Sequence, residues 1–284
     1  MRSGTEINQD QAAYWNSELG RKWVDHEAAL DTSFQPVLDL VLNRAALKAG
    51  ERVLDIGCGT GASTLAAAAL VGATGMVEGL DISTPLLARA RERAIGVAAA
   101  RFTVADAQTH GFVASGYDAL ISRFGVMFFA NSSAAFANLG RSIRPGGRAV
   151  FASWAGLAGN PWFSIGIRAA VGRLGKPAPL LPGAPGPMAF QDIGQVQGWL
   201  EAAGWADVAG QEVAVPLTPP GTLTEAAQLV GGFGPAVRIL AELRGTQADA
   251  AAIVEAVADA LAEYAGPDGV KVPASINLFS AVRR

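Results

Sequence analysis

A glycine-rich segment, residues 53–61 (VLDIGCGTG), contains the residues whose types and spacing best suit a binding site. Gly57, Gly59 and Gly61 let the backbone turn tightly and approach a ligand without an intervening Cβ atom. The helix predicted directly after them would present free N–H groups at its start. Together with Ala62 the segment also satisfies the dinucleotide fingerprint Gly57-x-Gly59-x-x-Ala62, so a nicotinamide cofactor is one alternative.

Three acidic residues at predicted strand ends favour a different ligand. Asp55 lies two residues before Gly57, where its carboxylate would repel a pyrophosphate but not a cationic, amino-acid-bearing cofactor. Asp81 (in GLDIS) ends the next predicted strand and can accept hydrogen bonds from ribose hydroxyls. Asp106 (in ADA) follows the third strand and can accept one from an exocyclic adenine amine.

Apolar strands and helices alternate through the first half of the chain. Strands are predicted at 52–56, 76–80, 101–105, 117–122 and 148–153. Helices are predicted at 63–71, 84–95 and 132–143, and the Pro-Gly-Gly sequence at 145–147 is predicted as a turn. This order predicts a parallel sheet covered by helices on both faces, with ligands at the carboxyl ends of its strands.

The other segments predict additions around this sheet. Residues 8–47 have apolar and aromatic side chains at helical spacing. After the fifth strand come a mobile Pro/Gly-rich loop at 176–187, a helix capped by Asp192, strands at 208–217 and 275–282, helices at 223–243 and 247–264, and a turn at 266–269. We therefore expect one domain with inserted pieces along one rim.

Residues 50–154 resemble the class I S-adenosylmethionine (SAM)-dependent methyltransferases, in the broad group of the ubiquinone/menaquinone-biosynthesis enzymes. The matching segments are VLDIGCGTG, GLDIS, ADA, YDALISRFGVMFF and IRPGGRAVFASW, and YWN…GRKWV resembles an N-terminal lid. The resemblance implies a Rossmann-like α/β fold with a seven-stranded sheet, parallel except for one antiparallel strand near the edge, and helical cap insertions. It implies a lid at 1–48 and a SAM-binding domain at 49–284, with insertions at about 156–190 and 218–265.

The resemblance also implies roles for individual residues. Asp55 would orient the glycine loop and the methionine amino group, and the loop glycines would pass beneath the cofactor. Asp81 would hold the ribose with Ile82 against the adenine, and Asp106 and Ala107 would meet the adenine edge. Ser122 and Arg123 would lie near the methionine part, although relatives usually have an apolar residue at the position of Arg123. The full set expected at the cofactor is Trp23, Asp55, Gly57, Cys58, Gly59, Gly61, Asp81, Ile82, Asp106, Ala107, Ser122 and Arg123.

A few further residues have chemistry to consider. His26 lies in the expected lid and is a candidate proton acceptor, whereas His110 is expected to be solvated. Cys58 is expected to be a small residue that fits a tight loop, because no histidine nearby would activate its thiol. A substrate pocket is expected to draw on the aromatic residues Trp15, Trp23, Trp154, Trp162, Phe163 and Phe190, although each by itself also suits ordinary packing.

Composition excludes several classes of protein. With one cysteine the chain can form no intrachain disulfide and no cysteine-based zinc site, and we expect no metal. A net charge of −3 argues against nucleic acid as a partner. No stretch predicts a membrane span and the N-terminal segment has no apolar signal region, so we expect a cytoplasmic protein, monomeric or homodimeric.

These features predict methyl transfer from SAM to a small, partly apolar or aromatic acceptor, with O-, N- and C-methylation left open. Two alternatives remain at this point. One is a SAM-binding enzyme of this fold that catalyses a reaction other than methyl transfer, and the other is an NAD(P)-dependent oxidoreductase.

Overall fold

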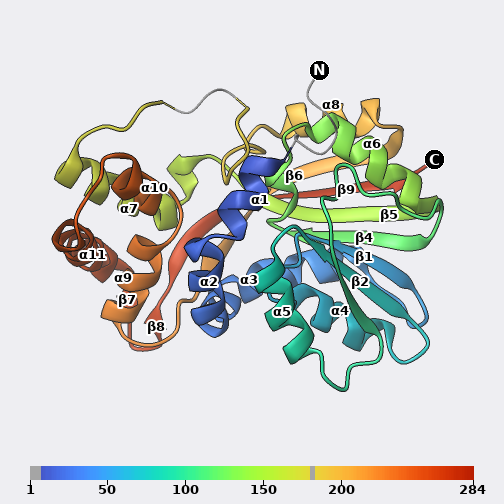
Figure 1. Ribbon diagram of the computed structural model, residues 1–284, viewed down its shortest axis with the longest axis horizontal. Helices are drawn as coiled ribbons and strands as arrows, with labels where there is room; N and C mark the ends of the chain where they lie inside the picture. Colours follow the sequence, from blue (N-terminus) through green and yellow to red (C-terminus); the bar gives the residue numbers. More distant parts are fainter. Residues whose placement is uncertain (1–7, 180–182) are drawn as a thin grey trace.

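A computed structural model describes residues 8–179 and 183–284, and a single seven-stranded sheet runs through the main body of the molecule (Figure 1). The strand order is β3-β2-β1-β4-β5-β9-β6. Strand β9 pairs antiparallel with both β5 and β6, and the other pairs are parallel, as predicted. The strands are β1 (Arg52–Ile56), β2 (Met76–Asp81), β3 (Ala100–Val104), β4 (Tyr117–Arg123), β5 (Ile143–Trp154), β6 (Trp205–Leu217) and β9 (Val272–Arg283).

Helices cover both faces of this sheet, which explains why successive residues of its central strands are buried on both sides, Asp55 of β1 included. In β1, Val53, Leu54 and Ile56 are all buried. Helices α3 (Glu27–Ala45) and α4 (Ala62–Val71) contact each other on one face, with α5 (Thr84–Arg93) beside β3, whereas α6 (Ser132–Ser142) and α8 (Ile193–Ala202) contact each other on the opposite face (Figure 1).

The predicted helical segment at 8–47 consists of α1 (Gln9–Trp15), α2 (Glu18–Asp25) and α3. The end of α1 is tied to the loop between β2 and α5. The Ser83 hydroxyl donates to the carbonyl of Trp15 at 2.7 Å, and the backbone N–H of Thr84 donates to Oδ1 of Asn16 at 2.9 Å. These bonds hold α1 over the carboxyl end of β2.

A second group of helices, which we call the outer helical cluster, lies at the far end of the molecule from β3 (Figure 1). It contains α7 (Pro161–Leu174), α9 (Leu223–Gly232), α10 (Pro235–Glu242) and α11 (Gln247–Leu261), with the hairpin β7 (Ala265–Gly266) and β8 (Gly269–Val270) beneath it. Short 3₁₀ turns occur at Val126–Phe128, Leu157–Gly159 and Ala262–Tyr264.

The sequence-based elements differ from the structure in a few places. The helix predicted at 223–243 is two helices, because Gly234 has φ +71° and Pro235 begins a new helix. The turn predicted at 145–147 lies inside β5, where the register with β4 shifts and Gly146 has φ +74°. Helix α7 was not predicted. Of the loop expected at 176–187, residues 180–182 lie outside the described part of the chain, as do residues 1–7.

Candidate functional site

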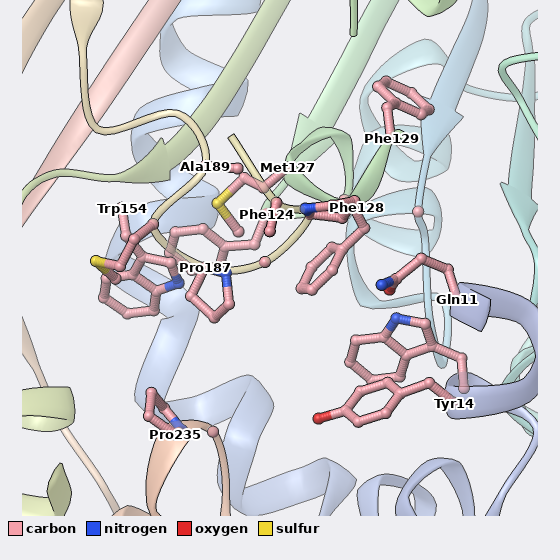
Figure 2. Close-up of a pocket in the computed structure, with 18 of the residues that line it drawn as sticks. Gln11, Tyr14, Phe124, Met127, Phe128, Phe129, Trp154, Pro187, Ala189 and Pro235 are labelled. Carbon is pink, nitrogen blue, oxygen red and sulfur yellow. The ribbon is translucent and has the colours of Figure 1, made fainter. Parts of the chain in front are cut away.

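One large cavity, of about 1170 Å³, opens above the carboxyl ends of β1, β2 and β4 (Figure 2). Small-ligand pockets typically occupy roughly 300–1,000 Å³. The cavity therefore has room for a cofactor and a second small molecule. One end is formed by the glycine loop and acidic side chains, and the other by aromatic side chains.

The glycine loop forms the floor of the first end. The N–H groups of Gly57 and Cys58 both donate to the carbonyl of Leu80, at 2.8 and 3.1 Å. A Cβ on Gly57 would lie 2.4 Å from the Cα of Gly125, so the two loops leave no room for a side chain there. A Cβ on Gly59 would meet nothing within 4 Å, and Gly59 lines the cavity. The loop is therefore packed from behind at Gly57 and open to a ligand at Gly59. Gly61 starts α4 and does not face the cavity; a Cβ there would lie 3.1 Å from Ala90 and Phe102.

Two of the predicted acidic residues lie on the cavity wall beside this loop. Asp81 accepts from the N–H groups of Gly59 at 2.8 Å and of Ser83 at 2.9 Å. Burial raises its pKa above the ordinary value, against the lowering effect of these bonds. Asp106 accepts from Nδ2 of Asn8 at 2.8 Å, which shows that this carboxylate can receive an NH₂ donor. Ile82 and Ala107 line the same end.

Asp55 and Ser122 lie behind the wall instead of on it. The Oδ2 atom of Asp55 accepts from the hydroxyls of Ser63 and Thr64, both at 2.6 Å, at the start of α4. Burial raises the pKa of Asp55 to about 6, and Oδ1 has no hydrogen-bond partner among the described residues. Ser122 donates to the carbonyl of Ile56 at 2.7 Å and accepts from the N–H of Gly125 at 3.1 Å. Both side chains fix the loops that line the cavity.

Cys58 is among the residues that line the cavity, but its side chain is buried in a small apolar cluster with Leu87 and Ala90, and its thiol is not suited to nucleophilic attack. Burial raises the pKa of the thiol well above its usual value, and the nearby carboxylates of Asp55 and Asp81 raise it further. A thiol held protonated in this way is a weak nucleophile. The structure therefore agrees with the expectation that Cys58 is a small residue of a tight loop.

Aromatic rings form the other end of the cavity (Figure 2). Phe124 and Trp154 stack with ring centroids 4.2 Å apart and planes 5° apart, and Phe163 meets Trp154 edge to face at 4.7 Å. Of the aromatic residues predicted for the pocket, five line it: Trp15, Trp23, Trp154, Trp162 and Phe163. Phe190 does not, because it is buried against Phe136, Phe151 and Trp199 on the opposite face of the sheet.

The proton acceptor suggested by the sequence is not brought to the cavity. His26 is not one of the described residues that line the cavity. Its ring packs edge to face on the ring of Phe233, with the ring centroids 5.5 Å apart. It lies between α2 and α3, where it is a boundary residue of both helices. The geometry gives no support to His26 as a base.

Several residues of the wall were missed by sequence reasoning. Arg123, which was expected, lines the cavity together with Asn8, Gln11, Tyr14, Phe34, Phe124, Met127 and Phe128. The segment FGVMFF after β4 was recognised as part of the motif YDALISRFGVMFF, but only Ser122 and Arg123 of that motif were assigned a role. Asn8 had no local signal at all, because its partner Asp106 is 98 residues away.

In the described part of the chain, no helix is long and apolar enough to cross a membrane. Within the same residues, no cluster of histidine, cysteine and carboxylate side chains could hold a metal ion.

Residues 53–147 match a family model described as a methyltransferase domain. Aklanonic acid methyltransferase DauC of Streptomyces sp. (strain C5) is 40% identical over 106 residues, which are 37% of this chain and 48% of that protein. Nocamycin O-methyltransferase of Saccharothrix syringae is 34% identical over 119 residues, 40% of this chain and 42% of that protein. The chain thus spans less than half the length of these curated relatives.

Solved structures agree in fold. Phosphoethanolamine N-methyltransferase 2 of Haemonchus contortus, in complex with phosphomonomethylethanolamine and S-adenosylhomocysteine, aligns with a TM-score of 0.58 at 21% identity, over 95% of this chain and 60% of that one. The [4+2]-cyclase SpnF aligns with a TM-score of 0.54 at 17% identity, over 93% and 95%. The sheet order and the glycine-loop site define the class I methyltransferase fold. With the match of residues 53–147 to a methyltransferase domain, the chain is similar to known methyltransferases in sequence over this part and in fold.

Proposed function

We propose that this chain is a SAM-dependent methyltransferase that acts on a small, partly apolar or aromatic acceptor. The observation that carries the proposal is that one cavity joins the glycine loop, Asp81 and Asp106 to a chamber of aromatic rings. A single cavity of this size can hold the cofactor at one end and the acceptor at the other. Methyltransferases are among the proteins that match this chain in sequence and in fold.

The first end of the cavity fits the cofactor. Gly59 leaves open space where a ligand can approach the backbone, and Asp81 offers carboxylate oxygens to a ribose. Asp106 already accepts from an amide NH₂ group, so an adenine amine is an equivalent donor. We assign Ile82 and Ala107 to the adenine, and Trp23 and Cys58 to the surrounding wall.

SAM, when bound, supplies a methyl group on a positively charged sulfur. The residues of this chain would then hold the acceptor in line with that group and keep water out. Positioning of this kind can provide about 7–11 kcal/mol of the barrier without a dedicated base. The stacked pair Phe124 and Trp154 presents a flat surface on which a planar acceptor can rest.

We also propose that residues 1–48 act as a lid, and that insertions at about 156–190 and 218–265 act as a cap on the domain at 49–284. In support, α1 is tied to the loop after β2, and α7 and α10 contribute side chains to the aromatic end. Closure by such elements would exclude water from the reacting atoms. A cytoplasmic location and a monomeric or homodimeric state stay predictions from the sequence.

Calorimetric titration with S-adenosylhomocysteine (SAH), SAM and NADH tests the proposal. We expect SAH and SAM to bind and NADH not to bind. Asp81→Asn should weaken SAH roughly tenfold or more, because a charged acceptor is lost. The matched control is Asp118→Asn, an acid paired with Arg144 at 2.6 Å near the beginning of β4, away from the cavity. Binding of NADH alone would contradict the proposal and favour an oxidoreductase.

Turnover separates methyl transfer from another reaction on the same fold. The protein is incubated with SAM and a panel of phenols, carboxylic acids and amines on planar aromatic frames, and products are analysed by mass spectrometry. A methylated product together with SAH establishes the transferase. Binding of SAM without any methylated product across a wide panel would favour the non-transferring alternative.

A further inference from the structure

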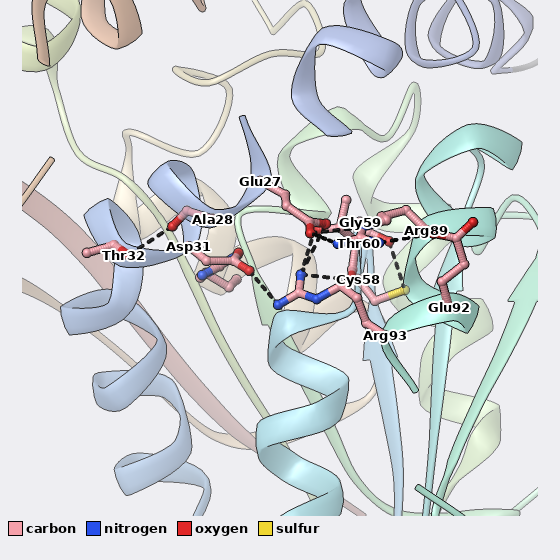
Figure 3. A network of polar contacts seen from close by, with 11 residues as sticks. Glu27, Ala28, Asp31, Thr32, Cys58, Gly59, Thr60, Arg89, Glu92 and Arg93 are labelled. Carbon is pink, nitrogen blue, oxygen red and sulfur yellow. Dashed lines mark hydrogen bonds and ion pairs between the residues drawn. The ribbon is translucent and has the colours of Figure 1, made fainter. Parts of the chain in front are cut away.

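The charged groups at the two ends of the cavity are balanced to different degrees. At the cofactor end, an ion network joins α3, α5 and the end of β4 (Figure 3). Three guanidinium groups of this network face three carboxylates: Arg89, Arg93 and Arg123 against Glu27, Asp31 and Glu92. The network therefore leaves no charge for a ligand. Two further cations line the cavity at its outer end, Lys176 and Arg238, and these are not balanced in the same way.

Lys176 and Arg238 belong to neighbouring segments, because the carboxylate of Glu242 on α10 joins the two. Its Oε2 atom accepts from Nη1 of Arg238 at 2.6 Å, and its Oε1 atom accepts from the backbone N–H of Ala178 at 2.7 Å. Lys176 lies two residues before Ala178, and its ammonium group has no ion pair or hydrogen bond within the described part of the chain. Two cations and one carboxylate leave one positive charge at this outer rim of the cavity.

The remaining exposed acids of the cavity wall do not neutralise this charge. Asp10 on α1 and Asp192 before α8 line the cavity, but neither forms an ion pair with a cation of the rim in the part of the chain that the structure describes. Asp192 instead caps its own helix, where it accepts from the N–H of Gln195 at 3.0 Å. The rim is therefore a place where an anionic group of a ligand would gain an ion pair.

An apolar track leads from the aromatic end of the cavity to this rim. Phe163, Ile167 and Val171 of α7 line the cavity at a spacing of four residues, so they form one face of the helix. At 1.5 Å per residue this face extends about 12 Å. Lys176 follows the end of α7 and so lies beyond Val171. A ligand that reaches from the stacked aromatic rings to the rim must therefore be long and mostly apolar.

We propose that the acceptor is an elongated, mostly apolar organic acid, and that Lys176 and Arg238 hold its anionic group at the outer rim. The inference rests on the proposed function, because it concerns the acceptor of the methyl group. A charged group at one end and an apolar body at the other fix the direction in which such a molecule enters. The atom that receives the methyl group then lies at the opposite end, near the glycine loop, and the acid serves for recognition.

The test measures the binding of two probes to the protein saturated with SAH, by calorimetry. The probes are biphenyl-4-carboxylate and biphenyl-4-carboxamide, which share an elongated aromatic body and differ in charge. Because SAH occupies the cofactor end, the probes report on the rest of the cavity. We expect the wild-type protein to bind the carboxylate roughly 3- to 10-fold more tightly than the amide. High salt should reduce this preference, since both cations are partly or fully exposed.

Variants of the rim should move this preference in both directions. Lys176→Gln and Arg238→Gln should each lower the preference, and the double variant should abolish it with little change in affinity for the amide. Glu242→Gln should raise it roughly two- to fivefold, because the one carboxylate of the rim loses its charge. A general loss of structure would weaken both probes together and would not shift their ratio in opposite directions.

Arg173→Gln is the matched control. Arg173 lies near the same end of α7, but its Nε atom pairs with Oδ1 of Asp249 at 2.7 Å. It is not among the described residues that line the cavity. This variant removes one positive charge from the same region and should keep the full preference for the carboxylate.

Three results would overturn the inference while leaving the proposed function intact. The wild-type protein could bind the two probes equally well, or the double variant could keep the wild-type preference. The third result is an SAH complex that binds neither probe. Failure of the wild-type protein to bind SAH would instead overturn the proposed function itself.

Discussion

The glycine loop allows one prediction to be worked out in detail, because two of its glycines share a backbone conformation but differ in surroundings. Gly57 has φ +65° and Gly59 has φ +56°, both in the left-handed region. An alanine in this region costs about 1–2 kcal/mol. That cost should be the same in Gly57→Ala and Gly59→Ala, so any difference between the two variants reports on contacts of the added methyl group.

The contacts of that methyl group differ sharply. At position 57 it would lie 2.4 Å from the Cα of Gly125, far inside the ordinary separation of about 3.5–4.0 Å between carbon atoms. Forcing the two loops apart should cost about 1–3 kcal/mol more. We therefore expect Gly57→Ala to lose roughly 2–5 kcal/mol of unfolding free energy. Gly59→Ala should lose only about 1–2 kcal/mol, because its methyl group meets no protein atom within 4 Å.

Thermal unfolding and SAH titration together check this reasoning. For a chain of this size about 1 kcal/mol corresponds to roughly 2–4 °C in Tm, so Gly57→Ala should melt well below Gly59→Ala. The ranking of the two variants should reverse for SAH affinity. The methyl group of Gly59→Ala projects into the cavity, so this variant should bind SAH much more weakly than Gly57→Ala does. Equal losses of Tm in both variants, or wild-type SAH affinity in Gly59→Ala, would refute the geometry of the loop.

Two further predictions concern the buried titratable groups behind and within the loop. Burial raises the pKa of Asp55 to about 6 from an ordinary value of 3.8, so the folded protein binds the extra proton more tightly than the unfolded chain does. The stability that this group contributes is present below about pH 4 and is lost as the pH rises through about 6, by roughly 3 kcal/mol at most. Urea unfolding across pH 4–7 should show this fall in the free energy of unfolding of the wild type. The Asp55→Asn variant should show a flatter profile. The second prediction concerns Cys58, because burial raises the pKa of its thiol. Iodoacetamide should react with this thiol slowly at pH 8 in the folded protein and rapidly in urea. Fast labelling of the native protein would contradict a buried, protonated thiol.

Much of the fold was determined by short-range sequence patterns. Segments of five or six mostly apolar residues predicted the central strands, because a strand buried on both faces needs side chains that lose water on each side. The positions of Asp81 and Asp106 followed from the same patterns, since both come directly after a strand. The resemblance to the class I methyltransferases also came from local motifs, and residues 53–147 match a methyltransferase domain model.

Only the tertiary structure decided which side chains share the cavity. Periodicity says which face of an element is apolar, but it does not say what that face meets. Phe163 and Phe190 are both buried aromatic residues, yet Phe163 lines the cavity while Phe190 packs on the other face of the sheet. His26 is turned toward Phe233 by the junction of two helices, which no local pattern records.

The polar contacts of the site show the same division. The glycines and acids could be read from the chain because each performs its task within a few residues of a strand end. The contacts between Asn8 and Asp106 and between Asp31 and Arg123 join residues 98 and 92 positions apart. Such pairs form only when the sheet and the lid helices bring distant segments together. The sequence alone therefore determined the loop that receives a ligand, and folding determined the partners that surround it.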